Sequence, residues 1–487
     1  MSKFMHQFIH SLEMREKAYF KRFTELYSRN DNKNYLKLYD YLEQKTDYSL
    51  EELKIHFADS TISKYLSSEI KYLEEQLLKA LVNFHFNNST ENKLQKEILF
   101  INILIEKGFV KKAGKILVKT KKMAYEYEEF NVILGLIQHE EEILFHEGIL
   151  GFTEKLLELQ NERILITEMI NNLNDLRILR EQIRDFQITV GFISDTSLYP
   201  KIFKNPLLLS EKNALSLKAR EHWFYIKDFS FYLTRQKKES LKISARYLQF
   251  VEENIKIFKK SKLLPMISNY LHNCALERDV ESFNKVYLKL MSLKEDNKLD
   301  QVYIDYIRFS RLQELFYNTN DIDAIKLLLN EVTNYADEQI EKLTSLQVDY
   351  FLRLIIRSYF LSNNFEGALK WVNFIYGSRA IESTLDQTRI YGFIIYFELE
   401  WFEKLRSDLE SARKVLKGKK KLSKLAEIFI HFFNSNLKNP KNIKIQLDEL
   451  SKKLQQLKLD NKENHAFEHF DYLIWLNSYR VRKKIIN

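Results

Sequence analysis

The sharpest chemical pattern in the sequence is an H-x-x-E-H arrangement formed by His465, Glu468 and His469. Two histidines four positions apart share one face of a helix and could hold zinc, with the glutamate beside them as a general base. Zinc hydrolases that this arrangement resembles need a further carboxylate ligand well downstream. The 18 residues after His469 (487 − 469) contain no carboxylate beyond Asp471. We therefore expect these three side chains to bind no metal.

A second set of potential ligands, His139, Glu142 and His146, would lie along one face of a helix. No second cluster completes a metal site with it, which favours a solvated helix face. The ten glycines never form G-x-x-x-x-G-K or G-x-G-x-x-G, and no G-x-S-x-G serine elbow occurs. The single cysteine, Cys274, excludes an internal disulfide and is expected to be buried and inert. The sequence thus predicts no cofactor and no enzyme active site.

Positive charge offers a different chemistry, because lysine and arginine neutralise the phosphates of nucleic acids. The formal net charge is +9, and lysines cluster over 111–122 and 414–424. Such clusters are more often solvated surface, and the residue usage is typical of an AT-rich genome, which enriches lysine regardless of function. Nucleic-acid binding is therefore disfavoured. If it occurs, it should be weak, indifferent to sequence and lost steeply as salt rises.

Residues 49–66 have the pattern of a helix-turn-helix. Ser49 and Glu52 form a capping box that opens a short first helix, and a long second helix is expected to begin at Thr61 or the residue before it. Thr61 and Lys64 at its start could reach bases or phosphates. However, the turn lacks the usual glycine, and glutamates follow directly. A cytoplasmic transcriptional regulator with this DNA-binding segment and a repeat sensor domain is the alternative function.

The elements that would position these groups are helices. Glycine (10) and proline (4) are scarce in 487 residues. Because both supply the turns between strands, the fold class is expected to be all-α. Apolar residues make up 45% of the chain, enough for a large core. No apolar run approaches the roughly 18 residues of a membrane helix, and the N-terminus lacks a signal-peptide pattern. We expect a cytoplasmic protein without membrane insertion.

Proline marks the predicted boundary between two parts of the chain. Pro200 and Pro206 lie in one loop, and proline disfavours a helix on its N-terminal side. One extended helix is expected before this loop, over 153–188. The sequence is therefore divided into an N-terminal helical subdomain, helical hairpins that include the long helix, a proline-bearing linker and a stack of helical hairpins. These are residues 1–90, 91–193, 194–212 and 213–487, respectively.

An anchor residue recurs in the C-terminal part at steps of 42, 42, 43 and 37 residues. The anchors are Lys238, Val280, Ile322, Phe365 and Phe402. Apolar residues mostly follow each anchor after three and seven positions. A further column stands six positions before the anchors: Tyr232, Cys274, Phe316, Tyr359 and Tyr396. Each unit is expected to be a helix, a short turn and a second helix, and the units must stack because one hairpin cannot bury its apolar face alone.

Two segments resemble the heart of a tetratricopeptide repeat. Residues 359–369 read Tyr-Phe-Leu-Ser-Asn-Asn-Phe-Glu-Gly-Ala-Leu, and residues 104–113 match with a glycine in the turn. The resemblance implies an irregular tetratricopeptide-like α-solenoid with helices longer than those of the standard 34-residue repeat. The blocks 16–23 and 34–39 are similar to the start of uncharacterised bacterial proteins that carry such repeats. Neither resemblance implies an activity.

In repeats of this kind the first helix of each pair lines a concave face that binds a peptide or helix of another protein. Arg353 and Arg357 are one turn apart and share a face, beside aromatic positions that the packing columns do not use. The predicted partner-binding face is Arg353, Arg357, Phe360, Tyr317, Ile394 and Phe397. Exposed aromatics beside two arginines suit an acidic peptide with apolar anchors. The first functional hypothesis is therefore a non-enzymatic interaction scaffold.

Overall fold

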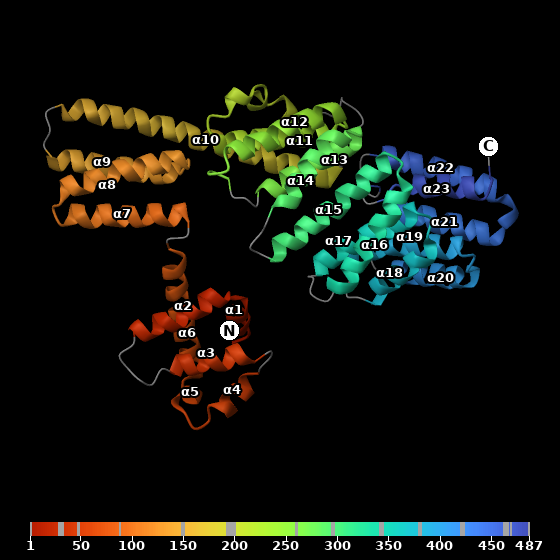
Figure 1. Ribbon diagram of the computed structural model, residues 1–487, viewed down its shortest axis with the longest axis horizontal. Coiled ribbons are helices and arrows are strands. Elements are labelled where there is room, and N and C mark those ends of the chain that lie inside the picture. Colours follow the sequence, from red (N-terminus) through yellow and green to blue (C-terminus); the bar gives the residue numbers. More distant parts are fainter. Residues whose placement is uncertain are drawn as a thin grey trace. The chain divides into compact units, whose positions relative to one another are not determined.

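The computed structural model describes an all-helical protein (Figure 1). The described residues are 2–27, 34–45, 49–86, 89–147, 151–190, 201–258, 262–293, 298–339, 345–377, 382–418, 424–460, 467 and 470–485. Every regular element within them is an α-helix or a short 3-10 helix, which confirms the all-α prediction. The chain forms two compact units, Met1–Glu168 and Met169–Asn487.

Two groups of helices make up the first unit. Its helices are α1 (Ser2–Ser11), α2 (Met14–Tyr27), α3 (Asn34–Gln44), α4 (Leu50–His56), α5 (Thr61–Lys64), α6 (Leu66–His85), α7 (Thr90–Glu106), α8 (Val110–Glu126), α9 (Phe130–Glu147) and the first part of α10 (Phe152–Val190). In the N-terminal group, α6 packs against α2 and α3 around a core that includes Phe20, Tyr39 and Leu73. Helices α7, α8 and α9 pack against one another.

The capping box at Ser49 is confirmed. Its hydroxyl accepts a hydrogen bond from the Glu52 amide at 3.1 Å, and its own amide donates to the Glu52 carboxylate at 3.0 Å. The long helix expected from Thr61 is interrupted, because Tyr65 leaves the helical region (φ −122°, ψ 27°). The amide of Tyr65 closes a tighter turn on the carbonyl of Ile62 at 3.2 Å. Helix α5 is therefore only four residues long, and α6 starts anew after it.

The predicted long helix is present as α10, but the division between the units falls inside it and not at the proline-bearing segment. The C-terminal part of α10 belongs to the core of the second unit through Leu176 and Ile183. Asn172 also ties down the segment that follows the prolines. Its amide nitrogen donates to the carbonyl of Asn213 at 2.8 Å, and its oxygen accepts from the amide of Leu215 at 2.9 Å. Pro200 and the residues from 191 lie outside the described residues.

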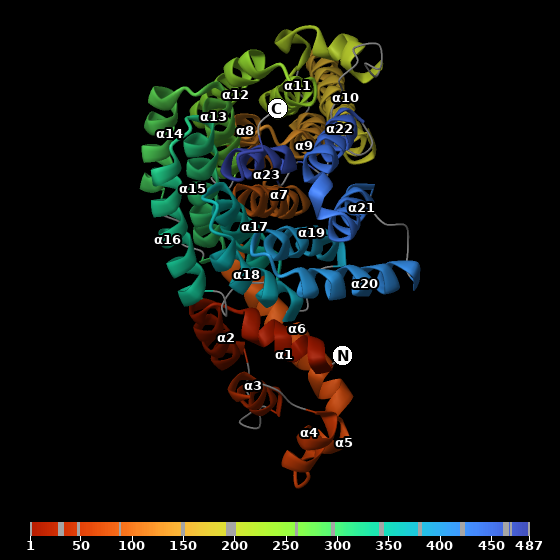
Figure 2. The ribbon, with the colours of Figure 1, turned by 90° about the vertical axis from the view of Figure 1, so that its right-hand side faces the viewer.

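The second unit consists of helices that pack mainly on their neighbours in sequence. After three 3-10 turns, η2 (Lys201–Lys204), η3 (Pro206–Leu208) and η4 (Glu211–Asn213), it contains α11 (Leu217–Leu233), α12 (Lys237–Glu253), α13 (Leu263–Glu277), α14 (Val280–Ser292), α15 (Lys298–Asn318), α16 (Ile322–Gln339), α17 (Ser345–Leu361), α18 (Phe365–Gly377), α19 (Glu382–Glu398), α20 (Phe402–Gly418), α21 (Lys424–Lys438), η7 (Pro440–Asn442), α22 (Ile443–Leu459) and α23 (Tyr472–Arg482). Figure 2 shows the same helices from a second direction, with α23 beside α22.

Four of the five predicted anchors are the first residues of helices, namely α14, α16, α18 and α20. The fifth is displaced by one position, because α12 begins at Lys237 rather than Lys238. The residue two positions before each helix start has a left-handed backbone. These residues are Arg235, Arg278, Asn320, Asn363 and Glu400, with φ between 54° and 60°.

The residue that follows each left-handed residue donates a hydrogen bond to the end of the preceding helix. This bond also explains the column six positions before the anchors. The amide of Asp321 reaches the carbonyl of Phe316 at 2.8 Å, and the amide of Asn364 reaches that of Tyr359 at 2.9 Å. This is the helix-ending bond in which a left-handed residue lets the chain turn back on the last helical carbonyls. In four of the five turns the residue in the column therefore supplies both a packed side chain and the acceptor that ends its helix, and at the first turn the acceptor is Phe231 instead of Tyr232.

Replacing Arg278 by glycine is expected to raise the free energy of unfolding by about 0.5–1 kcal/mol. The left-handed region is strained for a side chain with a Cβ but not for glycine, and Arg278 is exposed. Urea unfolding followed by circular dichroism measures the change. The control is Lys285→Gly on the exposed side of α14, which should cost about 1 kcal/mol because glycine weakens a helix interior. Equal losses in both variants would contradict the assignment of strain to Arg278.

Candidate functional site

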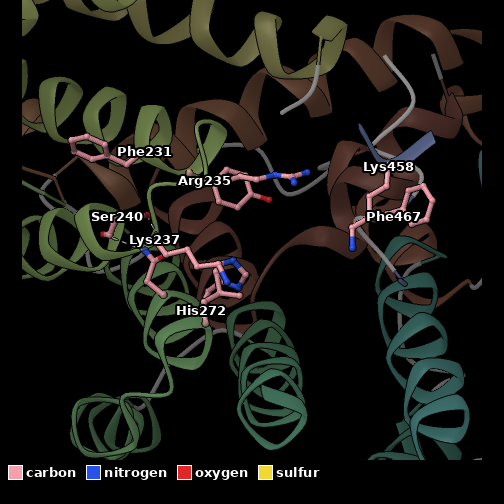
Figure 3. Close-up of a pocket in the computed structure, with 10 residues that line it drawn as sticks. Phe231, Arg235, Lys237, Ser240, His272, Lys458 and Phe467 are labelled. Atoms are coloured by element: carbon pink, nitrogen blue, oxygen red, sulfur yellow. Dashed lines mark hydrogen bonds between the residues drawn. The ribbon is translucent and has the colours of Figure 1, made fainter. Parts of the chain in front are cut away.

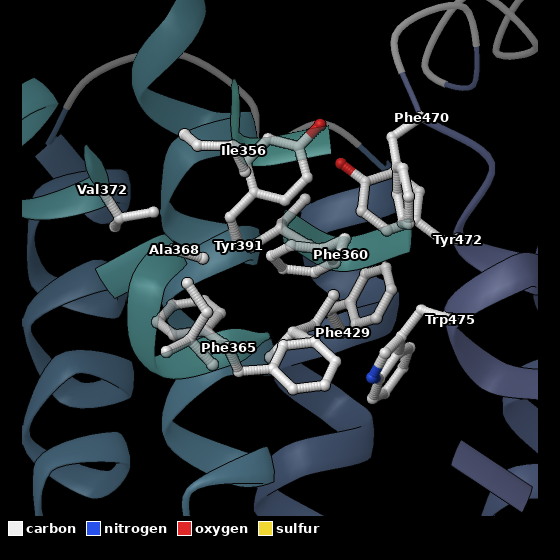
Figure 4. Close-up of a cluster of buried hydrophobic side chains, with 14 of the residues drawn as sticks. Ile356, Phe360, Phe365, Ala368, Val372, Tyr391, Phe429, Phe470, Tyr472 and Trp475 are labelled. Carbon is white, nitrogen blue, oxygen red and sulfur yellow. The ribbon is translucent and has the colours of Figure 1, made fainter. Parts of the chain in front are cut away.

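Three of the six residues predicted to form the partner-binding face lie in the core. Phe360, Ile394 and Phe397 have exposed fractions of 5%, 0% and 5%, so the predicted exposed strip is wrong for them. Their side of α17 and α19 is covered by the C-terminal segment and by α21, whose Phe433 ring lies 5.3 Å from that of Phe397. The ring of Phe470 lies 5.3 Å from that of Phe360, and the ring of Tyr479 lies 5.3 Å from that of Phe397. Figure 4 shows Phe360 and Phe470 within this cluster. The chain supplies its own helix to this face.

Charged groups fix the end of α23 beside α19. The side chain of Glu398 is only 2% exposed. It accepts a hydrogen bond from Trp475 Nε1 at 2.6 Å and two from the guanidinium of Arg482 at 2.6 and 3.0 Å. Lys483 pairs with Glu400 at 2.9 Å. A two-pronged guanidinium–carboxylate pair of this kind gives direction as well as attraction, so it sets how α23 lies on the face.

The other three predicted residues, Tyr317, Arg353 and Arg357, are half-buried. Burial raises the pKa of Tyr317; the carboxylate of Asp471 raises it further, and the charge of Arg357 opposes the rise. Burial likewise raises the pKa of Tyr391 to about 12, against the charge of Arg353. Of the three, Tyr317 is thus influenced by Asp471 of the C-terminal segment. That they bind a partner stays a prediction.

A half-buried ionic network lies next to Arg357 and joins α13 to α15. The guanidinium of Arg311 donates to Glu314 at 2.5 Å and to the hydroxyl of Ser268 at 3.2 Å. Nδ1 of His272 lies 2.9 Å from the same Glu314 oxygen. Burial raises the pKa of Glu314, but the charges of Arg311 and His272 bring it well below its ordinary value. The network therefore keeps this half-buried carboxylate ionised.

A cavity of about 330 Å³ opens beside this network, at the turn between α11 and α12 (Figure 3). Arg235, Lys237 and Lys458 bring three long cationic side chains to it, and Phe231 and Phe467 bring aromatic rings. In Figure 3 the guanidinium of Arg235 points toward the side on which Lys458 and Phe467 lie. None of the described residues that line the cavity is acidic. Its lining is thus positive on one part and apolar on another.

A chain of buried polar groups forms the wall behind the cavity. Ser240 Oγ donates to Asn273 Oδ1 at 3.1 Å, and Asn273 Nδ2 donates to Ser244 Oγ at 3.0 Å. Behind them Asp228 accepts from Ser240 at 3.4 Å and from the amide of Asn269. Burial raises the pKa of the Asp228 carboxyl to about 7, although both hydrogen bonds favour its charged form. This wall is therefore a hydrogen-bonded network that contains one buried acid with a raised pKa.

The far side of the cavity belongs to the C-terminal segment. Lys458, in the last turn of α22, pairs with Asp471 at 2.5 Å. Asp471 in turn caps α23 by accepting a hydrogen bond from the amide of Leu473 at 3.1 Å. Phe467 lies between these two residues in sequence and is 9% exposed. Lys458 and Phe467 therefore form the far side of the cavity.

Sequence reasoning missed the cavity because of the one-residue shift at α12. With Lys238 as anchor, the packing columns contain Leu241 and Ala245, which read as ordinary core residues. The structure buries Ser240 and Ser244 instead, at 2% exposure each. In the other four turns the second helix begins two residues after the left-handed residue. The same spacing from Arg235 places the start of α12 at Lys237. Lys458 carried no sequence signal, because its place in the cavity depends on a contact across more than 200 residues.

Several other expectations concern chemistry outside this surface. His465, Glu468 and His469 lie outside the described residues. Cys274 is fully buried, as predicted, and burial raises the pKa of its thiol to about 12. Within the described part of the chain, no three His, Cys, Asp or Glu side chains are grouped so as to hold a metal ion. Nδ1 of His139 lies 3.7 Å from a carboxylate oxygen of Glu142, and this half-buried histidine makes no hydrogen bond through that nitrogen.

Nucleic-acid binding, which the sequence disfavours, would involve Thr61 and the lysine clusters. Thr61 begins the four-residue α5, and its hydroxyl accepts a hydrogen bond from Asn34 at 3.0 Å. In the lysine cluster over 111–122, Lys121 pairs with Glu140 and with Glu162 of α10. Side chains 414–423 lie outside the described residues. In the part of the chain that the structure describes, no helix has the length and apolarity to cross a membrane.

Comparison with known proteins adds no identification to this geometry. No family model matches the chain, and no curated protein matches it. The likeness to tetratricopeptide repeats therefore stays a prediction from the sequence, and the function must be inferred from the surface that α23 covers and the cavity beside it.

Proposed function

We propose that the chain is a non-enzymatic interaction scaffold, in which a tetratricopeptide-like stack of helical hairpins presents the face of its first helices to a helix of another protein. The observation that carries the proposal is the position of α23. This helix packs its aromatic side chains against α19 and α21 and lies along α22, and its basic end pairs with two glutamates, Glu398 and Glu400. A face that holds one helix by aromatic packing and by ion pairs is suited to helix recognition.

The contacts of α23 describe the partner helix. Its buried residues follow the spacing i, i+3, i+4 and i+7, which places them on one face. They are Tyr472, Trp475, Leu476 and Tyr479. Because Glu398 and Glu400 meet Arg482 and Lys483, we infer a helix with aromatic anchors and a basic C-terminal end. This partner differs from the acidic peptide expected from the sequence, since the charges beside the buried aromatic residues are negative.

A partner helix has to compete with α23, which is attached to the same chain. Attachment gives α23 an effective concentration in the millimolar range. The apparent affinity for a partner is therefore lowered by the fraction of molecules in which α23 has left the face. Weakening the docking of α23 should raise that affinity about tenfold for each 1.4 kcal/mol of docking energy that is lost.

A labelled peptide of residues 470–485 tests the proposal, with fluorescence anisotropy measured against the full-length chain. We expect saturable binding, and tighter binding to a chain that carries Arg482→Ala together with Lys483→Ala. The control peptide carries Trp475→Ala and Tyr479→Ala and should not bind, because it lacks the aromatic anchors. If the peptide binds to neither chain, the face is a closed part of the core and the scaffold proposal is wrong.

A further inference from the structure

Helix α8 in the first unit is strongly amphipathic. Its buried side packs against α7 and α9 (Figure 1), through Ala113, Leu117, Thr120 and Ala124. The opposite side carries five exposed lysines, which together form the lysine face. They are Lys111, Lys112, Lys115, Lys119 and Lys122. Because an α-helix rises about 1.5 Å per residue, the lysine face extends over about 16 Å.

The positive charge of the lysine face is not balanced locally. In the described part of the chain, none of its five lysines forms an ion pair with a carboxylate. Lys121 is the sixth lysine of α8 and behaves differently, because it turns toward α9 and α10 and bonds to Glu140 and Glu162 at 2.6 and 2.7 Å. The only acidic residue of α8, Glu126, lies at its C-terminal end. The lysine face therefore favours an anionic partner with an extended surface.

Two exposed apolar side chains accompany these lysines. Val118 is 67% exposed. It lies between Lys115 and Lys122 on the same side of the helix, since residues three and four positions apart are neighbours. Phe109 is 62% exposed and directly precedes the first residue of α8. Apolar groups beside lysines are suited to the boundary of a lipid bilayer, where the headgroups attract the cations and the acyl chains receive the apolar groups.

The apolar side chains distinguish between two polyanions, a nucleic acid and a lipid bilayer. Phosphate groups of both attract lysine. A nucleic acid would place Val118 against a charged backbone, where its burial gains little. The lysine face also contains no arginine, asparagine or glutamine, the side chains that most often read base edges. A bilayer can take up both Val118 and Phe109 between its headgroups, so the observations favour the bilayer.

We infer that the lysine face binds the surface of a bilayer that contains anionic lipids, with its lysines on the headgroups and with Val118 and Phe109 in the interfacial layer. Clusters of about four to eight basic residues on an amphipathic helix are typical of contacts with anionic lipids. The inference goes beyond the proposed recognition of a protein helix, because the partner is a lipid surface. It also uses none of the residues that hold α23.

Sedimentation of the full-length chain with vesicles of phosphatidylcholine and phosphatidylserine measures this binding. We expect binding that weakens as salt rises, because salt screens exposed charges, and no binding to vesicles of phosphatidylcholine alone. Lys111→Gln, Lys115→Gln and Lys122→Gln together should weaken the binding about a hundredfold, since each lysine near an anionic surface contributes about fivefold.

The matched control is Lys238→Gln, Lys285→Gln and Lys452→Gln together. These three lysines are exposed on α12, α14 and α22, so the control removes the same total charge away from the lysine face. It should leave the affinity for the vesicles within about twofold of the unmodified chain. Circular dichroism should show equal helix content in both triple variants.

A fluorescent label at position 118 separates insertion from electrostatic capture. Cys274 is fully buried, so Val118→Cys provides the accessible thiol for an environment-sensitive dye. On vesicles that contain phosphatidylserine, the emission should rise and shift to the blue. The same dye on Leu288→Cys, at a position that is 69% exposed on α14, should not change.

The inference is overturned if phosphatidylserine makes no difference to binding, if the control triple variant weakens binding as much as the first, or if the dye at position 118 does not respond in the bound chain. A DNA duplex that binds more tightly than the vesicles, and is lost in the first triple variant, would assign the lysine face to nucleic acid and would also overturn it. The labelled-peptide test of the scaffold is independent of these results, since it uses different residues and a different partner.

Discussion

Replacing Arg482 by alanine is expected to lower the free energy of unfolding by about 2–4 kcal/mol. Removing one partner of a buried pair leaves the other charge desolvated and unpaired, and such losses reach about 3–5 kcal/mol. The figure for this pair is smaller because the arginine side chain is 31% exposed, whereas that of Glu398 is only 2% exposed. Of the two side chains that donate to the Glu398 carboxylate, Arg482 and Trp475, only Trp475 would remain. Urea unfolding followed by tryptophan fluorescence measures the loss.

Lys483→Ala is the control, because it removes a positive charge from the next residue. Its partner Glu400 is 64% exposed, and exposed pairs contribute less than about 1 kcal/mol. Adding Glu398→Gln to Arg482→Ala should recover a large part of the loss, since the buried charge is then gone. A loss of the same size in both single variants would mean that α23 is held by its aromatic residues and not by this pair.

The helices themselves could be predicted from the sequence because their signals are local. The long helix over 153–188 is present as Phe152–Val190, and the capping box at Ser49 opens α4. Polar turns with a left-handed residue end each first helix, and apolar spacing identifies which side packs. Of the positions expected to pack on α17, Leu352, Ile355 and Ile356 are buried, and Tyr359 is half-buried. Such features depend on neighbours within a few residues.

What covers a helix face could not be predicted in the same way. Spacing shows that Phe360 and Phe397 are apolar, but it does not show which segment packs on them. Ser478 bonds to Asn363 across 115 residues of sequence, and Arg482 reaches Glu398 across 84. Contacts over such distances leave no periodic pattern. The chain's own C-terminal segment was therefore missed as the occupant of the face where a partner was expected.

Buried polar groups were missed for a different reason. A serine or asparagine in a helix normally indicates a solvated side, because an unpaired polar group is costly to bury. Ser240 and Asn273 are buried nonetheless, since each supplies the hydrogen bond that the other needs. The sequence shows no sign of this pairing, because the two residues belong to different hairpins.

Asp228 is expected to make the stability of the second unit depend on pH. Burial raises the pKa of its carboxyl to about 7 from an ordinary value of 3.8. Below about pH 4 the carboxyl is protonated in both the folded and the unfolded chain. Between about pH 4 and 7 the folded chain keeps a proton that the unfolded chain loses, so stability falls as pH rises through this range. Above pH 7 the loss is complete, at about 4 kcal/mol for three pKa units.

Asp228→Asn isolates this contribution, because the amide stays neutral and can still accept from Asn269 and donate to Ser240. The difference in unfolding free energy between variant and unmodified chain should be near zero at pH 4, grow in favour of the variant up to pH 7, and stay level to pH 8. Asp323→Asn controls for the loss of one negative charge at a carboxylate that is 90% exposed. A difference at Asp228 that does not change with pH would show that the carboxyl is already ionised in the folded chain at pH 4. The network behind the cavity would then hold a charge, and its hydrogen bonds from Ser240 and Asn269 would outweigh the cost of burial.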